Sequence, residues 1–210
     1  MSEVDRLVEV MHRLRHDCPW DAEQTHLSLV PYLVEEACEV VEAIEAGTSA
    51  DLREELGDLL LQVVFHAEIA SEGPAGFDLE QVAGGIADKL VARHPHVFGP
   101  MAGERVDLAE LNVTWEQRKA VEKGRTSVLE GIPDQLSALA KATKIISRAR
   151  SRSVPVALAA EPIEAMDLGE QVLDLVARAQ SSGFDAEQAV RDAVRRLEAS
   201  VQAAEAAAAR

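Results

Sequence analysis

Apolar and polar residues follow the period of an α-helix along most of the chain. In residues 4–15, Leu7, Val10 and Leu14 fall on one side, which predicts an amphipathic helix. We expect this helix to end before Pro19, because a proline disfavours helical backbone in the residue that precedes it.

Two further helices are predicted next, with a very short connection between them. One covers residues 28–47 and has Pro31 in its first turn, where the missing N–H costs little. Thr48 and Asp51 have the spacing of a capping box, which predicts the start of a third helix running to about residue 72. The body of this third helix is apolar around almost its whole circumference, so we expect it to be buried on most sides.

The remaining pattern also favours helices. A fourth is expected over residues 78–93, followed by a loop at 94–100 and a fifth helix over 107–122. A hinge at 124–133 leads to two or three more helices and an alanine-rich tail that is expected to fray. Since aromatic residues make up only 3% of the chain and β-branched runs are short, the fold class is predicted to be all-α.

Four carboxylates lie where apolar helix faces should meet. Glu36 borders the apolar stripe of the second helix, and Glu39 lies one turn further along the same edge. Glu55 and Asp58, also one turn apart, share a narrow sector of the apolar third helix. A buried, unpaired carboxylate costs several kcal/mol or takes up a proton. Two such pairs on adjacent antiparallel helices therefore need a positive charge between them.

A divalent cation is the simplest source of that charge. Carboxylate oxygens without an accompanying Cys/His set favour Mg²⁺, with Mn²⁺ possible, over zinc. The alternative is a structural network completed by Arg or Lys from elsewhere in the chain. Glu35 adjoins Glu36 without needing to be a ligand, which makes it a candidate general base, with a solvated surface residue as the other interpretation.

Charge and composition exclude several classes of protein. The net charge is −16, and residues 1–124 carry −15 of it, so this part should repel duplex nucleic acid. No apolar run approaches the ~18 residues of a membrane span. The acidic N-terminus is not a signal peptide, and two cysteines do not suggest a disulfide framework. We expect a soluble protein of the cytoplasm.

An internal repeat divides the chain. The motif at 55–58 and the segment GFDLEQVAGGIADKL at 76–90 return as a motif at 167–170 and GFDAEQAVRDAVRRL at 183–197. The second copy has no counterpart of the helix that carries Glu36 and Glu39. We therefore expect a catalytic domain over 1–124, and a hinge with a degenerate, non-catalytic repeat over 125–210.

Glu35-Glu36-x-x-Glu39 followed by Glu55-x-x-Asp58 resembles the signature of the MazG nucleoside triphosphate pyrophosphohydrolases. The segments CPWDAEQTH, PYLVEEACEV, ELGDLLLQVVFHA, DKLVARHPHVF and WEQRK also stand in that family's order, over roughly residues 4–124.

The resemblance implies a MazG-like helical bundle that is completed by dimerisation. It also implies Mg²⁺-dependent hydrolysis of an NTP or dNTP to the monophosphate and pyrophosphate, as in nucleotide-pool housekeeping. The matching positions imply metal ligands at Glu36, Glu39, Glu55 and Asp58, phosphate contacts at Lys89 and Arg93, and nucleotide contacts at Trp115 and Lys119. The repeat replaces Lys89 by Arg196 and Arg93 by Ser200, so only the first copy is expected to be catalytic.

Two other interpretations remain open from the sequence. The spacing Glu9-x-x-His12 and Glu23-x-x-His26 is found in ferritin-like di-iron proteins. A catalytically silent nucleotide-binding or regulatory module with the same helices is the other alternative. Pyrophosphate release that depends on Mg²⁺ would exclude both.

Overall fold

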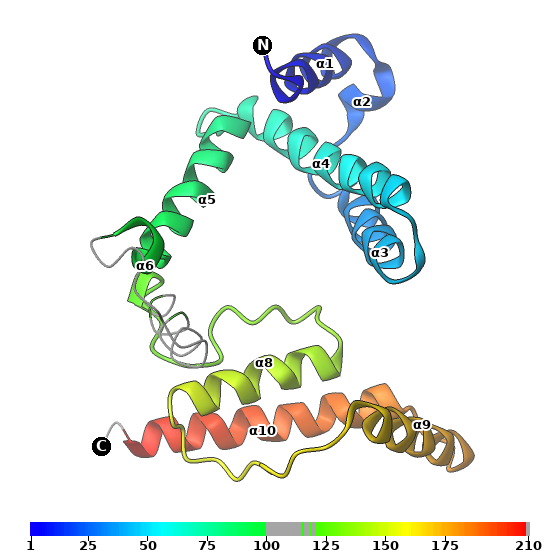
Figure 1. Ribbon diagram of the computed structural model, residues 1–210, viewed down its shortest axis with the longest axis vertical. Coiled ribbons are helices and arrows are strands. Elements are labelled where there is room, and N and C mark those ends of the chain that lie inside the picture. Colours follow the sequence, from blue (N-terminus) through cyan, green and yellow to red (C-terminus); the bar gives the residue numbers. More distant parts are fainter. Residues whose placement is uncertain (100–114, 116–117, 119–120, 209–210) are drawn as a thin grey trace. The chain divides into compact units, whose positions relative to one another are not determined.

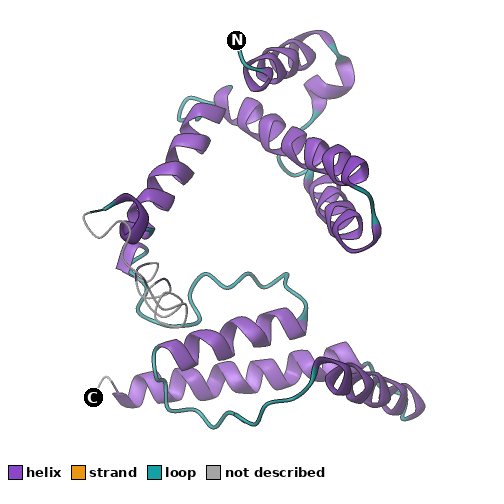
Figure 2. Ribbon diagram, viewed as in Figure 1, coloured by secondary structure: helices purple, strands orange, loops and turns teal. Residues whose placement is uncertain are grey.

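The computed structural model describes residues 1–99, 115, 118 and 121–208. Within these residues all regular secondary structure is helical, as the uniform colouring of Figure 2 shows. This confirms the predicted all-α class. The chain forms two compact units, Met1–Ala102 and Gly103–Arg210, which are described separately. The division into a catalytic domain over 1–124 and a repeat over 125–210 stays a prediction.

The first unit opens with α1 (Glu3–Asp17), which begins and ends close to the predicted limits. Ser2 caps it, and its hydroxyl accepts from the Asp5 backbone N–H while the Asp5 carboxylate accepts from that of Ser2. A short helix, α2 (Pro19–Glu23), follows between the first two predicted helices. Pro19 stands in its first turn, a position that proline favours.

Next come α3 (Val30–Ala46) and α4 (Ser49–Ser71), which form a hairpin. The Thr48 cap of α4 is confirmed, because its side chain accepts from Asp51 N–H and the Asp51 carboxylate accepts from Thr48 N–H. Figure 1 shows the two helices side by side along most of their length. The predicted pair of adjacent helices is therefore present.

The unit closes with α5 (Leu79–Arg93), capped by Asp78, and the single turn α6 (Pro95–Phe98). The predicted loop at 94–100 was wrong here, because Pro95 supplies a helix-compatible φ at the first position of a turn. Most of the fifth predicted helix, 107–122, lies outside the described residues.

The core of the first unit joins α1, α4 and the start of α3. Met11, Leu29, Val64 and Phe65 are buried together, at 1–3% exposure. Arg15 crosses the edge of this core, donating to the carbonyls of Asp21 and Gln24 and forming two bonds with Glu72. These contacts fix the α1–α2 segment against α4.

The expectation that α4 is buried on most sides was wrong for a single chain. Leu56, Leu60 and Val63 are 49%, 38% and 39% exposed. Their spacing of i, i+4 and i+7 puts them on one face, so a whole apolar stripe of α4 lies open.

The second unit contains α8 (Ala138–Ser151), α9 (Ala165–Ser181) and α10 (Ala186–Ala208). Its core is formed by α8, α10 and the segment before α8, through the buried side chains of Val128, Ile145, Val194 and Val201. The alanine-rich tail stays helical to Ala208, so the prediction of fraying was wrong up to that residue.

Candidate metal centre

A two-residue connection holds α3 and α4 in register. Gly47 and Thr48 link the helices, and the Gly47 N–H donates to the carbonyl of Ala43. A Cβ on Gly47 would lie 2.8 Å from both the Cα and the carbonyl oxygen of Ala43, so a larger residue would force the turn apart. So short a loop makes the helices antiparallel neighbours, which brings side chains 16–19 residues apart in the sequence face to face.

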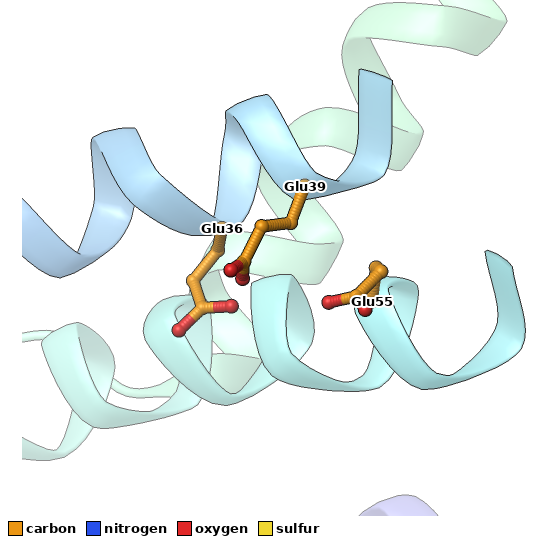
Figure 3. A group of neighbouring side chains, drawn as sticks. All are labelled: Glu36, Glu39 and Glu55. Atoms are coloured by element: carbon orange, nitrogen blue, oxygen red, sulfur yellow. The ribbon is translucent and has the colours of Figure 1, made fainter. Parts of the chain in front are cut away.

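The carboxylates of Glu36, Glu39 and Glu55 meet across this hairpin. One oxygen from each lies within 4.8 Å of the other two. Figure 3 shows the first two side chains leaving α3 and the third leaving α4, with their carboxylates gathered beside the helix pair. Among the described residues, these three form the one group of His, Cys, Asp or Glu side chains with spacing suited to a metal ion.

The electrostatics of this cluster show the cost of crowding like charges. Partial burial raises the pKa of Glu36, and the charges of Asp58 and Glu39 raise it further. Partial burial likewise raises the pKa of Glu55, with Glu39 and Asp58 the next causes. Glu36 and Glu55 are therefore harder to ionise because their acidic neighbours are ionised, and a cation between the carboxylates would remove that repulsion.

The donor set fits a hard divalent cation. Metal–oxygen distances of ~2.1 Å, as for Mg²⁺, put ligands on opposite sides of the ion about 4.2 Å apart. Neighbouring ligands of such an ion lie about 3 Å apart, so the Glu36, Glu39 and Glu55 oxygens would move closer than their 4.8 Å limit to hold it. Glu36 and Glu55 are half-buried and Glu39 is exposed, so the cluster is open to solvent and to a ligand on one side.

A groove extends from the cluster toward the hairpin turn. It has a volume of about 290 Å³ and is lined by Glu39, Glu42, Asp51 and Glu55 together with Ala43, Ala46 and Gly47. Four carboxylates with no cation among these lining residues make it strongly electronegative. A triphosphate could enter only beside bound cations.

Asp58 and Glu35 border the cluster. Asp58 is half-buried one turn beyond Glu55, and its charge raises the pKa of both Glu36 and Glu55, although it stands outside the tight group of three. Glu35 is exposed and its charge also raises the pKa of Glu36, which places it near the cluster without making it part of it.

The residues expected to contact phosphate are on α5, and the direction of this helix decides whether they can reach the carboxylates. Lys89 and Arg93 are half-buried near the end of that helix. In Figure 1, α5 leaves the C-terminal end of α4 and runs away from the α3–α4 hairpin. The described contacts therefore do not bring these two cations to the carboxylates of the same chain.

Of the expected nucleotide contacts, Trp115 is helical and half-buried, in the second compact unit. Lys119 lies outside the described residues.

Sequence reasoning missed two histidine contacts, and both bear on the di-iron alternative. His12 pairs with Glu68 at 2.7 Å, and His26 Nδ1 lies 2.8 Å from His66 Nδ1. These partners are 56 and 40 residues apart, so no local spacing could reveal them. The carboxylate group contains no histidine, unlike the Glu-x-x-His sets of di-iron bundles.

A known family model matches the part of the chain that contains the carboxylate hairpin. Residues 24–98, which include it, match the model of the MazG nucleotide pyrophosphohydrolase domain. A 26.1 kDa protein of Streptomyces cacaoi, named as uncharacterized, is 47% identical over 202 residues, which is 95% of this chain and 81% of that one. The chain belongs to the MazG family.

Two further proteins are similar to this chain, one over 57% and the other over 97% of its own length. The nucleoside triphosphate pyrophosphohydrolase of Escherichia coli K12 is 46% identical over 154 residues, or 70% of this chain and 57% of that one. The crystal structure of a MazG-related protein from Thermotoga maritima is 32% identical, covers 55% of this chain and 97% of its own, and has a TM-score of 0.47. This chain thus spans little more than half of the E. coli MazG protein.

Among the described residues of this MazG protein, no helix has both the length and the apolar content that a membrane crossing needs.

Proposed function

We propose that this MazG protein hydrolyses nucleoside triphosphates, NTP or dNTP, to the monophosphate and pyrophosphate. The observation that carries the proposal is the convergence of the Glu36, Glu39 and Glu55 oxygens within 4.8 Å, in a chain of this family. The E. coli relative, which is 46% identical over 154 residues, is named a nucleoside triphosphate pyrophosphohydrolase. Housekeeping of the nucleotide pool is the proposed biological role.

Mg²⁺ is the proposed cofactor, with Mn²⁺ as a substitute. Glu36, Glu39 and Glu55 would hold it, with Asp58 as the fourth ligand, because hard carboxylate oxygens suit these ions. When bound, the cation would act as a Lewis acid and would neutralise the charge of the phosphate groups. The carboxylates themselves keep the ion at the mouth of the acidic groove, which would otherwise repel the substrate.

The remaining groups are assigned by what they can do chemically. Glu35, exposed beside Glu36, is the proposed base that takes a proton from the attacking water. The water oxygen forms the new bond to either the α- or the β-phosphorus, the bond from that phosphorus to the bridging oxygen breaks, and the bridging oxygen leaves with the electron pair as part of the other product. Lys89 and Arg93 are proposed to bind the phosphate chain, and Trp115 and Lys119 to approach the nucleoside.

A homodimer is part of the proposal, because the described residues of the first unit leave apolar faces of the hairpin exposed. Val34, Val41 and Ile44 of α3 are 58%, 50% and 65% exposed, in addition to the open stripe of α4. Contiguous apolar faces of this kind are usually interfaces. A second copy packed there would also allow α5 of one chain to bring Lys89 to the carboxylates of the other, which the course of α5 prevents within one chain.

The test is a pyrophosphate-release screen of the purified chain over canonical and modified NTPs and dNTPs with Mg²⁺. We expect turnover that EDTA abolishes and Mg²⁺ restores. Nucleotide binding without turnover in saturating Mg²⁺ or Mn²⁺ would replace this proposal by the silent binding module.

A further inference from the structure

Two polar atoms of α4 are buried without a hydrogen-bond partner among the described residues. They are the amide oxygen Oε1 of Gln62 and the ring nitrogen Nε2 of His66. Gln62 as a whole is only 5% exposed. Buried polar groups in folded proteins are almost always paired, because an unpaired group has lost its bonds to water and gained nothing in return. These two atoms therefore need an explanation.

Both residues lie on the stripe of α4 that carries a proposed metal ligand. Asp58, Gln62 and His66 follow one another at intervals of four residues. Each side chain is therefore about one turn further along the helix and roughly 40° further round it than the one before. Side chains with this spacing can reach each other, and a hydrogen bond between Gln and Asp at this spacing stabilises a helix. Gln62 thus stands between Asp58 and the histidine.

The other end of the stripe is fixed by the contact between His26 and His66. Their Nδ1 atoms are 2.8 Å apart and their ring centroids are 5.1 Å apart. The centroid distance is close to the sum of that contact and the two ring radii, so the two nitrogens point at each other. One proton lies between them, and in a neutral imidazole one nitrogen donates while the other accepts. The position of this proton therefore decides whether His66 Nε2 is a donor or an acceptor.

The charge of Asp58 selects one of the two arrangements. The Gln62 amide is favoured with its NH₂ group toward the carboxylate, because its oxygen would be repelled there. Oε1 then points along α4 to His66, and since it can only accept, His66 Nε2 must carry a proton. His66 Nδ1 is then the acceptor and His26 Nδ1–H the donor. Every donor in this series points toward Asp58, and hydrogen bonds aligned in this way strengthen one another.

We propose that His26, His66 and Gln62 form a hydrogen-bonded chain that holds the Asp58 carboxylate in position for a divalent cation. A rotation of the Gln62 amide, or one bridging water, closes the step between Oε1 and Nε2. Gln62 and His66 are positioning residues, since they act through Asp58 without touching the ion. The inference rests on the proposed function only in taking Asp58 as a metal ligand.

Magnesium affinity in the absence of nucleotide tests this chain of hydrogen bonds. Gln62→Leu replaces the amide by an apolar side chain, and we expect it to raise the Kd for Mg²⁺ at least ~10-fold, as the loss of an outer partner of a metal ligand does. Val64→Ala is the matched control, because Val64 is equally buried in α4, at 1% exposure, but belongs to the core. It should leave the Kd unchanged. Isothermal titration calorimetry measures the Kd, and circular dichroism shows that each variant is folded.

A double-variant cycle separates positioning from packing. His66→Phe keeps an aromatic ring but has no Nε2, so it should also weaken Mg²⁺ binding. Adding it to Gln62→Leu should weaken binding no further, because the first change has already broken the chain. Effects of the two substitutions that multiply would show that they act independently, which would overturn the proposal.

The histidine tautomers give a readout that involves no metal. Nitrogen NMR of the full chain at about pH 8 should show the proton of His66 on Nε2 and that of His26 on Nδ1. A His66 proton on Nδ1 would overturn the proposal, and so would an equal Kd for Mg²⁺ in wild type and Gln62→Leu. Either result leaves the proposed function standing. A wild-type chain that binds no Mg²⁺ would refute both, whereas one with the expected affinities and tautomers but no pyrophosphate release would refute the proposed function alone.

Discussion

His26 and His66 face each other with their Nδ1 atoms 2.8 Å apart and their rings stacked at 11°. One nitrogen must donate and the other accept, so at least one ring is neutral. Burial lowers the pKa of His66, and the nearby His26 lowers it further. The contact ties the segment that leads into α3 to the middle of α4, and it depends on this protonation state.

A loss of stability in weak acid follows from this pair. A His whose pKa is lowered in the folded state contributes stability above its ordinary value of 6.5, and this is lost as the pH falls through the lower folded value. We expect the melting temperature of wild type to fall more steeply below pH 6.5 than that of His66→Gln. Thermal unfolding followed by circular dichroism from pH 8 to about 5 measures this. His16→Gln, on the exposed side of α1, should keep the wild-type slope, and parallel curves for wild type and His66→Gln would refute the prediction.

Removal of a single carboxylate should lower the activity while leaving the fold unchanged. Glu39→Ala or Asp58→Ala is expected to lower kcat by more than ~100-fold while leaving helix content unchanged, because the loss of one acid relieves repulsion in the cluster. Glu45→Ala is the control, since it removes an exposed acid of the same helix outside the cluster. Substantial activity in either of the first two variants would show that the ligand assignment is wrong.

Divalent cations should stabilise the folded chain without substrate. An ion that binds only the native state adds about 2.7 kcal/mol at a hundred times its Kd. We expect Mg²⁺ to raise the midpoint of urea unfolding for wild type and for Glu45→Ala, EDTA to reverse it, and Glu36→Gln to abolish it. An equal Mg²⁺ effect on all three chains would indicate binding at another site.

If Lys89 acts on the carboxylates of the other copy, two inactive variants should complement each other. A mixed dimer of Glu39→Ala and Lys89→Ala chains contains one site with both defects and one intact site. Unfolding and refolding an equal mixture should therefore restore about a quarter of wild-type activity, because half the dimers are mixed. Recovery no greater than in either variant alone would place Lys89 in the site of its own chain, or outside it.

Arg15 should be the cation whose loss most weakens the first unit. Its side chain is 7% exposed and bonds with Glu72 and with two backbone carbonyls. Arg15→Ala is expected to cost about 1–3 kcal/mol, because the part-buried carbonyl oxygens of Asp21 and Gln24 lose their donor. Arg13→Ala breaks only an exposed pair with Asp17, which should change the free energy of unfolding by less than about 0.5 kcal/mol in urea titrations. Equal costs for both variants would contradict the role given to Arg15.

The features that sequence alone predicted are local ones. The capping box at Thr48, the position of Pro31 and the pairing of Glu36 with Glu39 depend on residues within one turn of each other. Glu55 could be placed opposite them because only two residues separate the helices. Periodicity and spacing were therefore sufficient to predict the hairpin.

The features that sequence missed are decided by distant partners. His66 meets a residue 40 positions away, and nothing in its own helix indicates that contact. Leu60 has the same apolar character as a core leucine, so periodicity predicted burial for its helix, whereas the side chain is 38% exposed. Whether such a face is covered depends on which other elements, or which other chains, are present to pack against it.

The two-residue turn at Gly47 and Thr48 also bears on how the protein folds. Closing so short a loop loses little chain entropy, so the helix pair can form early and with few distant contacts. The acids that repel one another are then brought together at the beginning of folding. Dissolved magnesium that screens them would act as an assembly aid for the nascent polypeptide, well before any nucleotide arrives.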